Sequence, residues 1–530
     1  MREPFLALLG AVSCVLLIAC ANVGNLQLER VLGRRHELGL RRALGASRGR
    51  VIRQTLTENF VLAVLGAGAG LAAAWWTLPL VVRLIPPYVP HVSDITLRPE
   101  VFVAAAAVVL TTMMIVGLIP AIRAASASLM EDLRTGPRSQ ASAGQWPRRA
   151  LVVGEVALAT TLLVGAALTV QTFLTLRPSD PGFNPAHKII GGVRRNGPFV
   201  ADGKNRVFFT RMLQRVRAVP GIQAVSATDY LPMSGMVGTA KADAGEVQKT
   251  VWLSRMTSNY LHEMAIPILA GRSFQASDDE HAPAVAIVNE RAARALWADG
   301  SPIGMSLTLE LFDGKRIETQ VIGIARNTRS LGVTLDVHNE VYLPYAQDST
   351  PMLHVIATVA GAAPPDLLHA FREAATAEDS GVVIDRIVSF QDIVDGSVSA
   401  ERFGAWLFGA FGVIAVALAG LGLAAVVTWW VTQRTREIGV RIALGAPRGA
   451  VARLILGQSV GLAAAGIALG VVISLLSTRL LRGWLYGVTP LDARTFVLGS
   501  AAMLVIAALA SYLPARRAAG VDPIVTLRAE

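Results

Sequence analysis

The segment 433–451, QRTREIGVRIALGAPRGAV, decides how this chain is organised, because a close copy of it, GRRHELGLRRALGASRGRV, stands at 33–51. The similarity continues into the flanking apolar sequence, first at an offset of 400 residues and then at an offset of 394. It pairs Leu56 with Leu456, Gly70 with Gly470, Phe102 with Phe496, Pro120 with Pro514, and Arg134 with Arg528. We therefore expect two copies of one module in the same orientation, at 5–134 and about 405–530.

Both copies contain long apolar runs. The chain is 53% hydrophobic and only 16% charged, which excludes a disordered chain and an ordinary cytosolic enzyme. A helix needs about 20 apolar residues to cross a bilayer. Runs of that length occur at 5–28, 56–82, 101–120, 150–173, 403–430, 454–477 and 496–514. The expected fold class is a polytopic α-helical membrane protein of about seven spans, formed by two parallel three-span repeats and one extra span.

The charge distribution predicts the orientation of these spans. Residues 174–402 carry 22 Lys and Arg against 25 Asp and Glu, whereas the rest of the chain carries 27 against 13. The positive excess lies in short loops, as in membrane topology signals, so we expect no nucleic-acid partner. The Arg-rich loops at 29–53, 121–149 and 431–453 and the C-terminus are expected in the cytoplasm. The N-terminus and residues 174–402 are expected outside a bacterial plasma (inner) membrane.

The segment 174–402 is predicted to be one extracytoplasmic domain of mixed α/β structure, punctuated by Gly, Pro and Asp. We expect strands at Lys188–Gly192, Ala284–Val288, Gln320–Ile324, Glu340–Leu343, Leu353–Val359 and Val382–Val388, and helices at Lys204–Val219 and Asn289–Trp297. The expected domains are a first three-span module (1–135), a cytoplasmic linker with the fourth span (136–173), the extracytoplasmic domain (174–402) and a second three-span module (403–530).

The repeated segment resembles the C-terminal signature of the ABC transporter permease family that includes FtsX, the lipoprotein-releasing permeases and MacB. The outside segment is similar to the MacB-like periplasmic core domain, in DPGFNPAHKI at 180–189 and GRSFQASDDEHAPAVAIVNERAARALW at 271–297. The duplication further resembles the acidobacterial-type duplicated permeases. Those proteins have a span and a periplasmic domain before the first module, so the resemblance predicts either a shortened protein or an internal start at Met1.

The resemblance implies a permease subunit of an ABC-type export or mechanotransmission complex, in which ATP hydrolysis moves the periplasmic domain. The ATPase is expected to be a separate cytoplasmic chain, because the sequence has no G-x-x-x-x-G-K-[ST] motif. Its Gly-Lys pairs at 203–204 and 314–315 continue with Asn205 and Arg316. We therefore expect no enzyme activity, catalytic residue, cofactor or metal in this chain. The acidic cluster 278–281 is interpreted as a solvated loop.

The repeated loop has the features of a coupling elbow. A short helix from Glu37 would end at Gly45, and Ser47 or Pro447 suits the start of the next helix. Glu and Arg four residues apart would pair on each short helix. The resemblance assigns this region to contact with the ATPase; the alternative is that Arg only fixes topology. The predicted coupling residues are Glu37, Gly39, Arg41, Gly45, Ala46, Arg48, Glu437, Gly439, Arg441, Gly445, Ala446 and Arg448.

Some polar and small residues lie within the predicted spans. Glu155 is a functional candidate by position, but it is near the cytoplasmic end of its span. We expect it to snorkel or to pair with Arg148 or Arg149, and we interpret Glu58 in the same way. Helix packing is the role expected of Asn22, Asn25, Gly66, Gly68, Gly70, Gly466 and Gly470.

Three functional hypotheses follow. The first is the export or mechanotransmission permease, with membrane lipid and a cytoplasmic ABC ATPase as partners. The second is an FtsX-like signalling or scaffold protein, which regulates a periplasmic or envelope partner without transport. The third is an inactive truncated permease. Whether 174–402 binds an apolar ligand or an envelope enzyme would separate the first two hypotheses.

Overall fold

The computed structural model forms two compact units. One consists of Met1–Thr175 and Ala400–Glu530 and is named the helical unit; the other, Leu176–Ser399, is named the α/β unit. The residues that the structure describes are 2–33, 47–85, 98–109, 111–112, 145–176, 180–195, 203–245, 247–298, 300–332, 335–361, 365–379, 381–385, 387–444, 446–478, 485–489 and 491–520.

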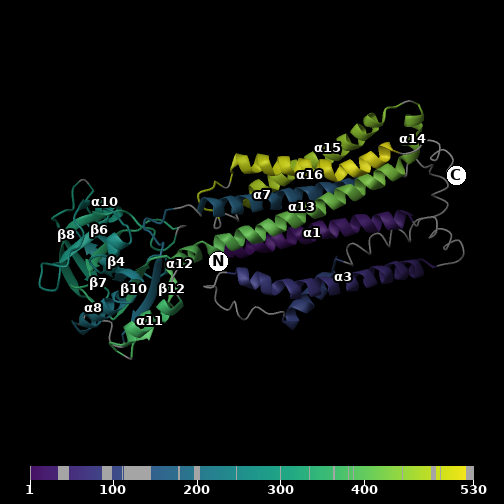
Figure 1. Ribbon diagram of the computed structural model, residues 1–530. Helices are drawn as coiled ribbons and strands as arrows, with labels where there is room; N and C mark the ends of the chain where they lie inside the picture. Colours follow the sequence, from purple (N-terminus) through teal and green to yellow (C-terminus); the bar gives the residue numbers. More distant parts are fainter. Residues whose placement is uncertain are drawn as a thin grey trace. The chain divides into compact units, whose positions relative to one another are not determined.

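The helical unit is built from long apolar helices, of which α1, α7, α13, α15 and α16 run side by side (Figure 1). Within the described residues, six helices are long and apolar enough to cross a membrane: α1 (Arg2–Gly33), α3 (Arg48–Leu84), α7 (Gln145–Leu176), α13 (Ser399–Gln433), α15 (Arg448–Ser477) and α16 (Ala493–Ala519). They contain six of the predicted spans. The remaining predicted span, 101–120, is described mainly as a helix at Pro99–Val109.

Helix α7 forms much of the core of this unit. Its residues Val152, Val156 and Ala159 are fully buried and share one apolar core with Ala415 and Ala419 of α13. Apolar contact alone does not drive helices together in lipid, so close van der Waals packing between small side chains has to hold them. The alanines of α13 provide that close packing.

The predicted packing glycines behave differently in the two copies. A Cβ atom added to Gly466 of α15 would lie 2.6 Å from Cβ of Val156 on α7. One added to Gly470 would lie 2.6 Å from the carbonyl oxygen of Ala157. The packing role is therefore confirmed for these two glycines. The counterpart glycines of α3, within 66–70, have no neighbouring atom of the described residues within 4 Å, so the expectation is not met there.

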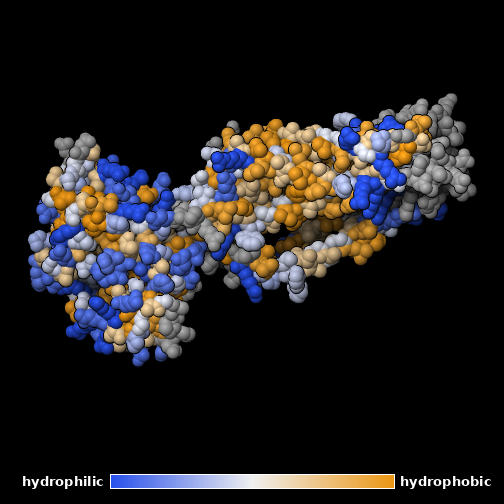
Figure 2. Space-filling model, turned by 45° about the horizontal axis from the view of Figure 1, so that its top comes forward, coloured by the Kyte–Doolittle hydropathy of each residue, from blue (hydrophilic) through white to orange (hydrophobic). Residues whose placement is uncertain are grey.

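The outer surface of the long helices is strongly apolar (Figure 2). Large apolar side chains point outward, with exposed fractions of 79% at Trp76, 67% at Leu421 and 66% at Leu509. Soluble proteins rarely expose a continuous apolar surface, because water does not solvate it well. Lipid is the environment that covers such a surface, which confirms that this unit belongs to a polytopic membrane protein.

The α/β unit contains one mixed sheet and several helices. Its strands are β1 (Lys188–Arg194), β2 (Ile222–Thr228), β3 (Gly238–Asp243), β4 (Gln248–Met256), β5 (Ile268–Gly271), β6 (Val285–Asn289), β7 (Ser306–Leu311), β8 (Arg316–Ala325), β9 (Glu340–Pro344), β10 (Met352–Val359), β11 (Val383–Ile384) and β12 (Val388–Ser389). Its helices are α8 (Gly203–Arg217), α9 (Tyr260–Glu263), α10 (Glu290–Leu296), α11 (Pro365–Thr376) and α12 (Phe390–Ser397).

The strand pairings divide this sheet into a closed ring and an open sheet. The ring runs β4-β3-β7-β8-β6-β9 and closes because β9 pairs in parallel with β4. It encloses an apolar core that includes Val288 and Val321. The open part runs β11-β1-β10-β2, and Thr228 of β2 pairs with Met256 of β4 to join the two parts. Helices α8 and α11 pack on the open part through Phe209 and Phe371.

The predicted elements of this unit are largely confirmed. Five of the six expected strands and both expected helices are present, with ends shifted by a few residues. The expected strand 382–388 is instead two short strands, β11 and β12, which pair with different parts of β1. Between them the Asp385 N–H donates to the carbonyl of Gly192 (2.7 Å), so the chain follows β1 without a continuous ladder.

Candidate coupling site and buried polar clusters

The short helix α14 (Thr435–Ala443) connects α13 to α15. It is followed by two backbone hydrogen bonds that close its last turn, from the Leu444 N–H to the Val440 carbonyl (3.0 Å) and from the Ala446 N–H to the Arg441 carbonyl (2.9 Å). Pro447 is then the N-cap of α15. The short helix and the immediate restart predicted for the second copy are therefore confirmed.

The first copy is described from its second helix onward. The Ser47 hydroxyl oxygen accepts a hydrogen bond from the Arg50 N–H (3.4 Å) and so caps α3. A side-chain acceptor here satisfies one of the free N–H groups at the helix start. The predicted role of Ser47 is thus confirmed, and the preceding segment lies outside the described residues.

Glu437 and Arg441 form the predicted pair on α14. The Arg441 Nη2 atom lies 2.6 Å from Glu437 Oε1, and both side chains are about half exposed. An exposed pair of this spacing contributes only about 0.3–0.5 kcal/mol to helix stability. Its main effect is therefore to hold the guanidinium in one orientation at the surface of the elbow.

The pair stands at the edge of a pocket of about 180 Å³ between α13, α14 and α15. Buried Ile438, Val451 and Ile455 supply apolar walls, so the pocket combines an apolar interior with a charged edge. This combination suits the docking of a side chain from another protein. The pocket is lined by Trp430, Val431, Arg434, Glu437, Ile438, Arg441, Ala446, Ala450, Val451, Leu454, Ile455 and Gln458.

The structure describes only part of the predicted coupling set. Glu437, Arg441 and Ala446 line the pocket, whereas buried Gly439 on α14 and exposed Arg448 at the start of α15 do not. Arg48 is the first residue of α3. Outside the described residues lie Glu37, Gly39, Arg41, Gly45, Ala46 and Gly445.

Two cation–π contacts connect the start of α7 to the end of α13. The Arg148 guanidinium carbon lies 3.8 Å from the centre of the Trp429 ring, and that of Arg149 lies 5.5 Å from the centre of the Trp430 ring. Such a contact contributes about 2 kcal/mol when it is shielded from water, and Arg148 is only 2% exposed. Because Trp430 also lines the pocket, these contacts connect the pocket to α7. This link was not predicted from the sequence, although a Trp-Trp pair at a span end is a recognisable signal.

The intramembrane polar residues meet between α1, α7 and α13. The Asn22 Nδ2 atom donates to the Leu418 carbonyl of α13 (3.0 Å), and Asn25 Nδ2 donates to Glu155 Oε1 of α7 (3.2 Å). The predicted interhelical role of both asparagines is confirmed. Glu155 differs from expectation: it is only 1% exposed, so it does not snorkel. Arg148 contacts Trp429 and does not pair with Glu155.

Glu58 and the acidic cluster 278–281 also have defined surroundings. Glu58 is exposed on α3 and accepts a hydrogen bond from Gln54 Nε2 (3.2 Å). Asp278 is only 6% exposed, and Arg272 donates to both of its oxygens (2.7 and 2.8 Å). The interpretation of this cluster as a solvated loop is therefore wrong for Asp278, whose charge is neutralised by an arginine.

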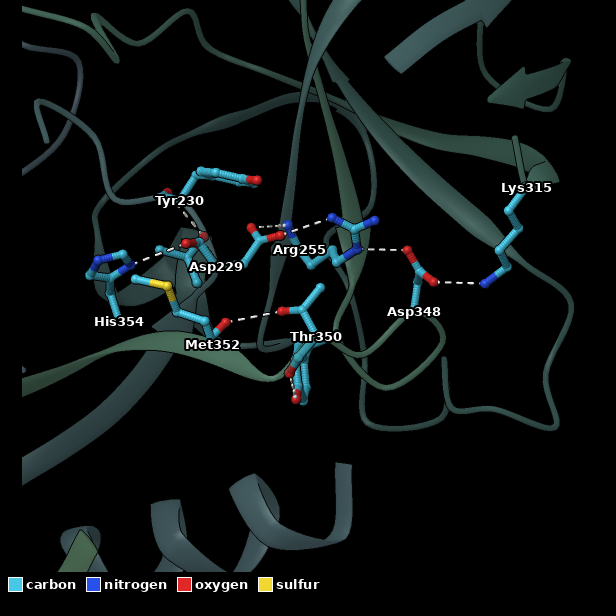
Figure 3. Close-up of polar contacts among 10 residues, drawn as sticks. Asp229, Tyr230, Arg255, Lys315, Asp348, Thr350, Met352 and His354 are labelled. Atoms are coloured by element: carbon cyan, nitrogen blue, oxygen red, sulfur yellow. Dashed lines mark hydrogen bonds and ion pairs between the residues drawn. The ribbon is translucent and has the colours of Figure 1, made fainter. Parts of the chain in front are cut away.

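A chain of ion pairs crosses the interior of the α/β unit (Figure 3). Arg255 Nη1 lies 3.0 Å from Asp229 Oδ2, and Arg255 Nε lies 2.6 Å from Asp348 Oδ2. Lys315 Nζ contacts the other oxygen of Asp348 (2.8 Å). Burial raises the pKa of Asp229 to about 6 although Arg255 opposes the shift, so Asp229 is ionised at pH 7. His354 Nδ1 contacts the Asp229 carbonyl (3.1 Å), and burial lowers the pKa of its imidazole.

A second buried acid, Glu340 of β9, is surrounded by hydroxyl groups. Thr328 Oγ1 donates to its Oε2 atom (3.0 Å), and Ser330 Oγ donates to Oε1 (2.6 Å). Tyr342 also donates to Oε2. Burial raises the pKa of Glu340 above its ordinary 4.5, with the hydroxyls opposing the shift. All of these partners belong to the α/β unit. We therefore interpret the Glu340 cluster as a contribution to the stability of that unit and not as a reactive site.

Glu340→Gln is expected to change how the stability of the α/β unit depends on pH. A raised pKa means that the folded state binds this proton more tightly, so the group's contribution is lost as pH rises through the folded pKa. As the pH rises from 4.5 to the folded-state pKa, the free energy of unfolding of the wild type should fall relative to that of Glu340→Gln. The fall should be up to about 1.4 kcal/mol per pH unit. Urea unfolding of both proteins from pH 4 to 8 measures this; parallel curves would contradict it.

Comparison with known proteins supports both halves of the resemblance. The model of the FtsX-like permease C-terminal family matches residues 9–129 and 409–523, and that of the MacB-like periplasmic core domain matches 101–378. The macrolide export ATP-binding/permease protein MacB of Marinobacter nauticus is 27% identical over 270 residues, 50% of this chain and 41% of that protein. The ABC transporter permease YknZ of Bacillus subtilis is 26% identical over 330 residues, 60% of this chain and 78% of that protein.

A solved structure, the periplasmic region of MacB from Actinobacillus actinomycetemcomitans, matches 41% of this chain and 95% of its own, with 14% identity and a TM-score of 0.29. The chain spans 41% of the length of its MacB relative. The long apolar helices and the matches to the two family models define a polytopic membrane permease. The chain belongs to the FtsX/MacB-type family of ABC transporter permeases.

Proposed function

We propose that this chain is the transmembrane subunit of an ABC-type export or mechanotransmission complex, driven by a separate cytoplasmic ATPase. The observation that carries the proposal is the pocket at the α13–α14–α15 elbow. Three residues predicted from the repeat, Glu437, Arg441 and Ala446, line it together. Macrolide export is what the MacB relative's name states of that protein, and a cargo of the same broad kind is the simplest extension to this chain.

The contacts in the helical unit provide a route for the motion. An ATPase bound at α14 would move α13 and α15, which adjoin it directly in the chain. The Arg148–Trp429 and Arg149–Trp430 contacts would carry the motion to α7. Because α7 leads into the α/β unit and α13 leads out of it, movement of the two helices would act on the two ends of that unit.

The proposal includes a duplicated organisation and an orientation. Residues 1–135 and 403–530 are two FtsX-like modules, separated by a linker and span at 136–173 and by the MacB-like domain at 174–402. Support comes from the FtsX-like family model, which matches the chain twice. The elbows and C-terminus would lie in the cytoplasm, and the N-terminus and the α/β unit outside the inner membrane.

A signalling or scaffold function is the second candidate. Phe312, at the tip of the β7–β8 hairpin, is 100% exposed. Burial of a Phe side chain away from water is favourable. A protein partner in the envelope would bury it. Phe312→Ser should then abolish capture of that partner and leave ATPase binding unchanged.

The ATPase proposal is tested by co-purification of the detergent-solubilised full chain with the soluble ATPases of its host. We expect wild type to capture an ATPase with vanadate-sensitive ATP hydrolysis, and Arg41→Glu/Arg441→Glu to capture at least about tenfold less, because reversing a contact charge costs several kcal/mol. Arg453→Glu is the matched control: Arg453 is an exposed cytoplasmic arginine of α15 that does not line the pocket. Equal loss in the control, or no capture by wild type, would contradict the proposal.

A further inference from the structure

The buried carboxyl group of Glu155 has an unusual setting. It is buried inside the helical unit, 1% exposed, where α1, α7 and α13 meet. One oxygen, Oε1, accepts the hydrogen bond from Asn25. The other, Oε2, is buried and has no hydrogen-bond partner among the described residues. One side of the carboxyl group is therefore satisfied and the other is not.

The Oε2 atom lies close to the backbone of α13 at Gly422. A Cβ atom at Gly422 of α13 would collide with Glu155 Oε2 and with Asn22 Oδ1. The carboxyl group therefore rests directly on the α13 backbone. Position 422 is the counterpart of position 22 at the repeat offset of 400, so α1 and α13 face each other here at equivalent positions. Glu155 is enclosed at the crossing of the two copies.

No described basic side chain forms an ion pair with Glu155. Arg148, seven residues earlier on α7 and so about 10 Å along the helix, contacts Trp429. Helix α13 has no charged residue between Arg402 and Arg434, and α15 has none after Arg453. The other titratable residues in the sequences of the helices packed nearby are Arg2, Glu3, Cys14, Cys20, Glu29 and Arg30 of α1, Arg149 of α7, and Arg494, Tyr512, Arg516 and Arg517 of α16.

We propose that Glu155 is an intramembrane proton-binding site, and that its protonated form holds α1 against α7 and α13. An ionised carboxylate without a cation is very costly in a low-dielectric interior, whereas a neutral carboxyl group accepts the Asn25 hydrogen bond at little cost. Separation of α1 would admit water, and the proton would leave to that water; repacking would take one proton up. The closed arrangement of the bundle is thus linked to pH. This inference requires neither an ATPase nor a cargo.

The protonation state is tested by infrared spectroscopy of the full chain in lipid nanodiscs. At pH 7 the wild-type spectrum should contain the C=O stretching band of a protonated carboxylic acid. Glu155→Gln should lose the part of this band that Glu155 contributes, seen in the wild-type-minus-variant difference spectrum, and Glu58→Gln should keep it, because Glu58 is an exposed carboxylate on another helix. Glu155→Asp, which keeps an acid, should shift the band and so serves if Glu155→Gln fails to fold. A wild-type spectrum without the band at pH 7 would overturn the proposal.

The linkage to α1 is tested by hydrogen exchange of α1 peptides in the same nanodiscs, corrected for intrinsic rates. Below the midpoint at which the infrared band disappears, exchange in wild type should accelerate about tenfold per pH unit, since each opening then releases one proton, and the acceleration should level off above the midpoint. Glu155→Gln has no proton to release, so its α1 exchange should not depend on pH. Identical pH dependence in both proteins would refute the proposal that protonated Glu155 holds α1 in place, even with the band present.

Discussion

Replacing Arg255 by Met is expected to lower the free energy of unfolding of the α/β unit by about 3–5 kcal/mol. The substitution leaves the Asp229 and Asp348 carboxylates, 5% and 3% exposed, without their shared guanidinium. Lys315 still pairs with Asp348, so most of the lost stability comes from the unpaired Asp229 carboxylate. Because a domain is stable by only about 5–15 kcal/mol, a loss of this size removes much of the margin. Urea unfolding of the segment 176–399, which contains its own apolar cores, measures it.

The pH dependence of this loss has a defined sign. Arg255 opposes the burial that raises the pKa of Asp229 to about 6, so without Arg255 that pKa rises further. Protonation then removes the unpaired charge, and Arg255→Met should cost less at pH 5 than at pH 8. Arg326→Met is the matched control, because the Arg326–Asp180 pair is about half exposed on both sides and should cost under about 1 kcal/mol. Equal costs for the two substitutions would contradict the prediction.

The sequence predicts well those features that depend on local patterns. Span positions follow from the length of apolar helix that a bilayer requires, and six long helices contain the runs predicted for them. The elbow follows from a short amphipathic helix and the restart at Pro447. The Glu437–Arg441 pair follows from its spacing of four residues. Each of these features is decided by residues close together in the chain.

Features that depend on distant partners were not predictable in this way. Strands β3 and β4 are missed because only alternate residues face the core and several of the others are Lys, Gln or Asp. Closure of the ring depends on the pairing of β4 with β9, far apart in sequence. Arg255 and Asp348 are 93 positions apart, and nothing local to either indicates the other.

Glu155 illustrates the same limit within a span. Its sequence position places it near the cytoplasmic end of an apolar run, which suggests contact with headgroups or with a neighbouring arginine. Which way its side chain points depends on the rotation of α7 about its axis. That rotation is fixed by the close packing of Gly466 and Gly470 on α7, which turns Glu155 toward α1 and α13. Burial of the acid is therefore a consequence of helix packing.

The same packing provides the second large expected effect, from Gly466→Val and Gly470→Val. Each added side chain would meet α7 atoms at 2.6 Å, and the Gly470 contact is with a backbone carbonyl that cannot rotate away. Overpacking of this kind costs about 1–3 kcal/mol per site. We expect the double variant to show a lower apparent melting temperature in detergent and a smaller yield of monodisperse protein than wild type.

The matched control uses the other copy of the module. Gly66→Val and Gly70→Val make the same chemical change at the repeat counterparts, where no described atom lies within 4 Å. Their effect should stay within about 0.5 kcal/mol, as for other exposed positions. A strong effect in both copies would mean that α3 packs against a further helix with the same geometry that α15 uses on α7. A weak effect in both copies would instead contradict the close contact between α15 and α7, and with it the packing that buries Glu155.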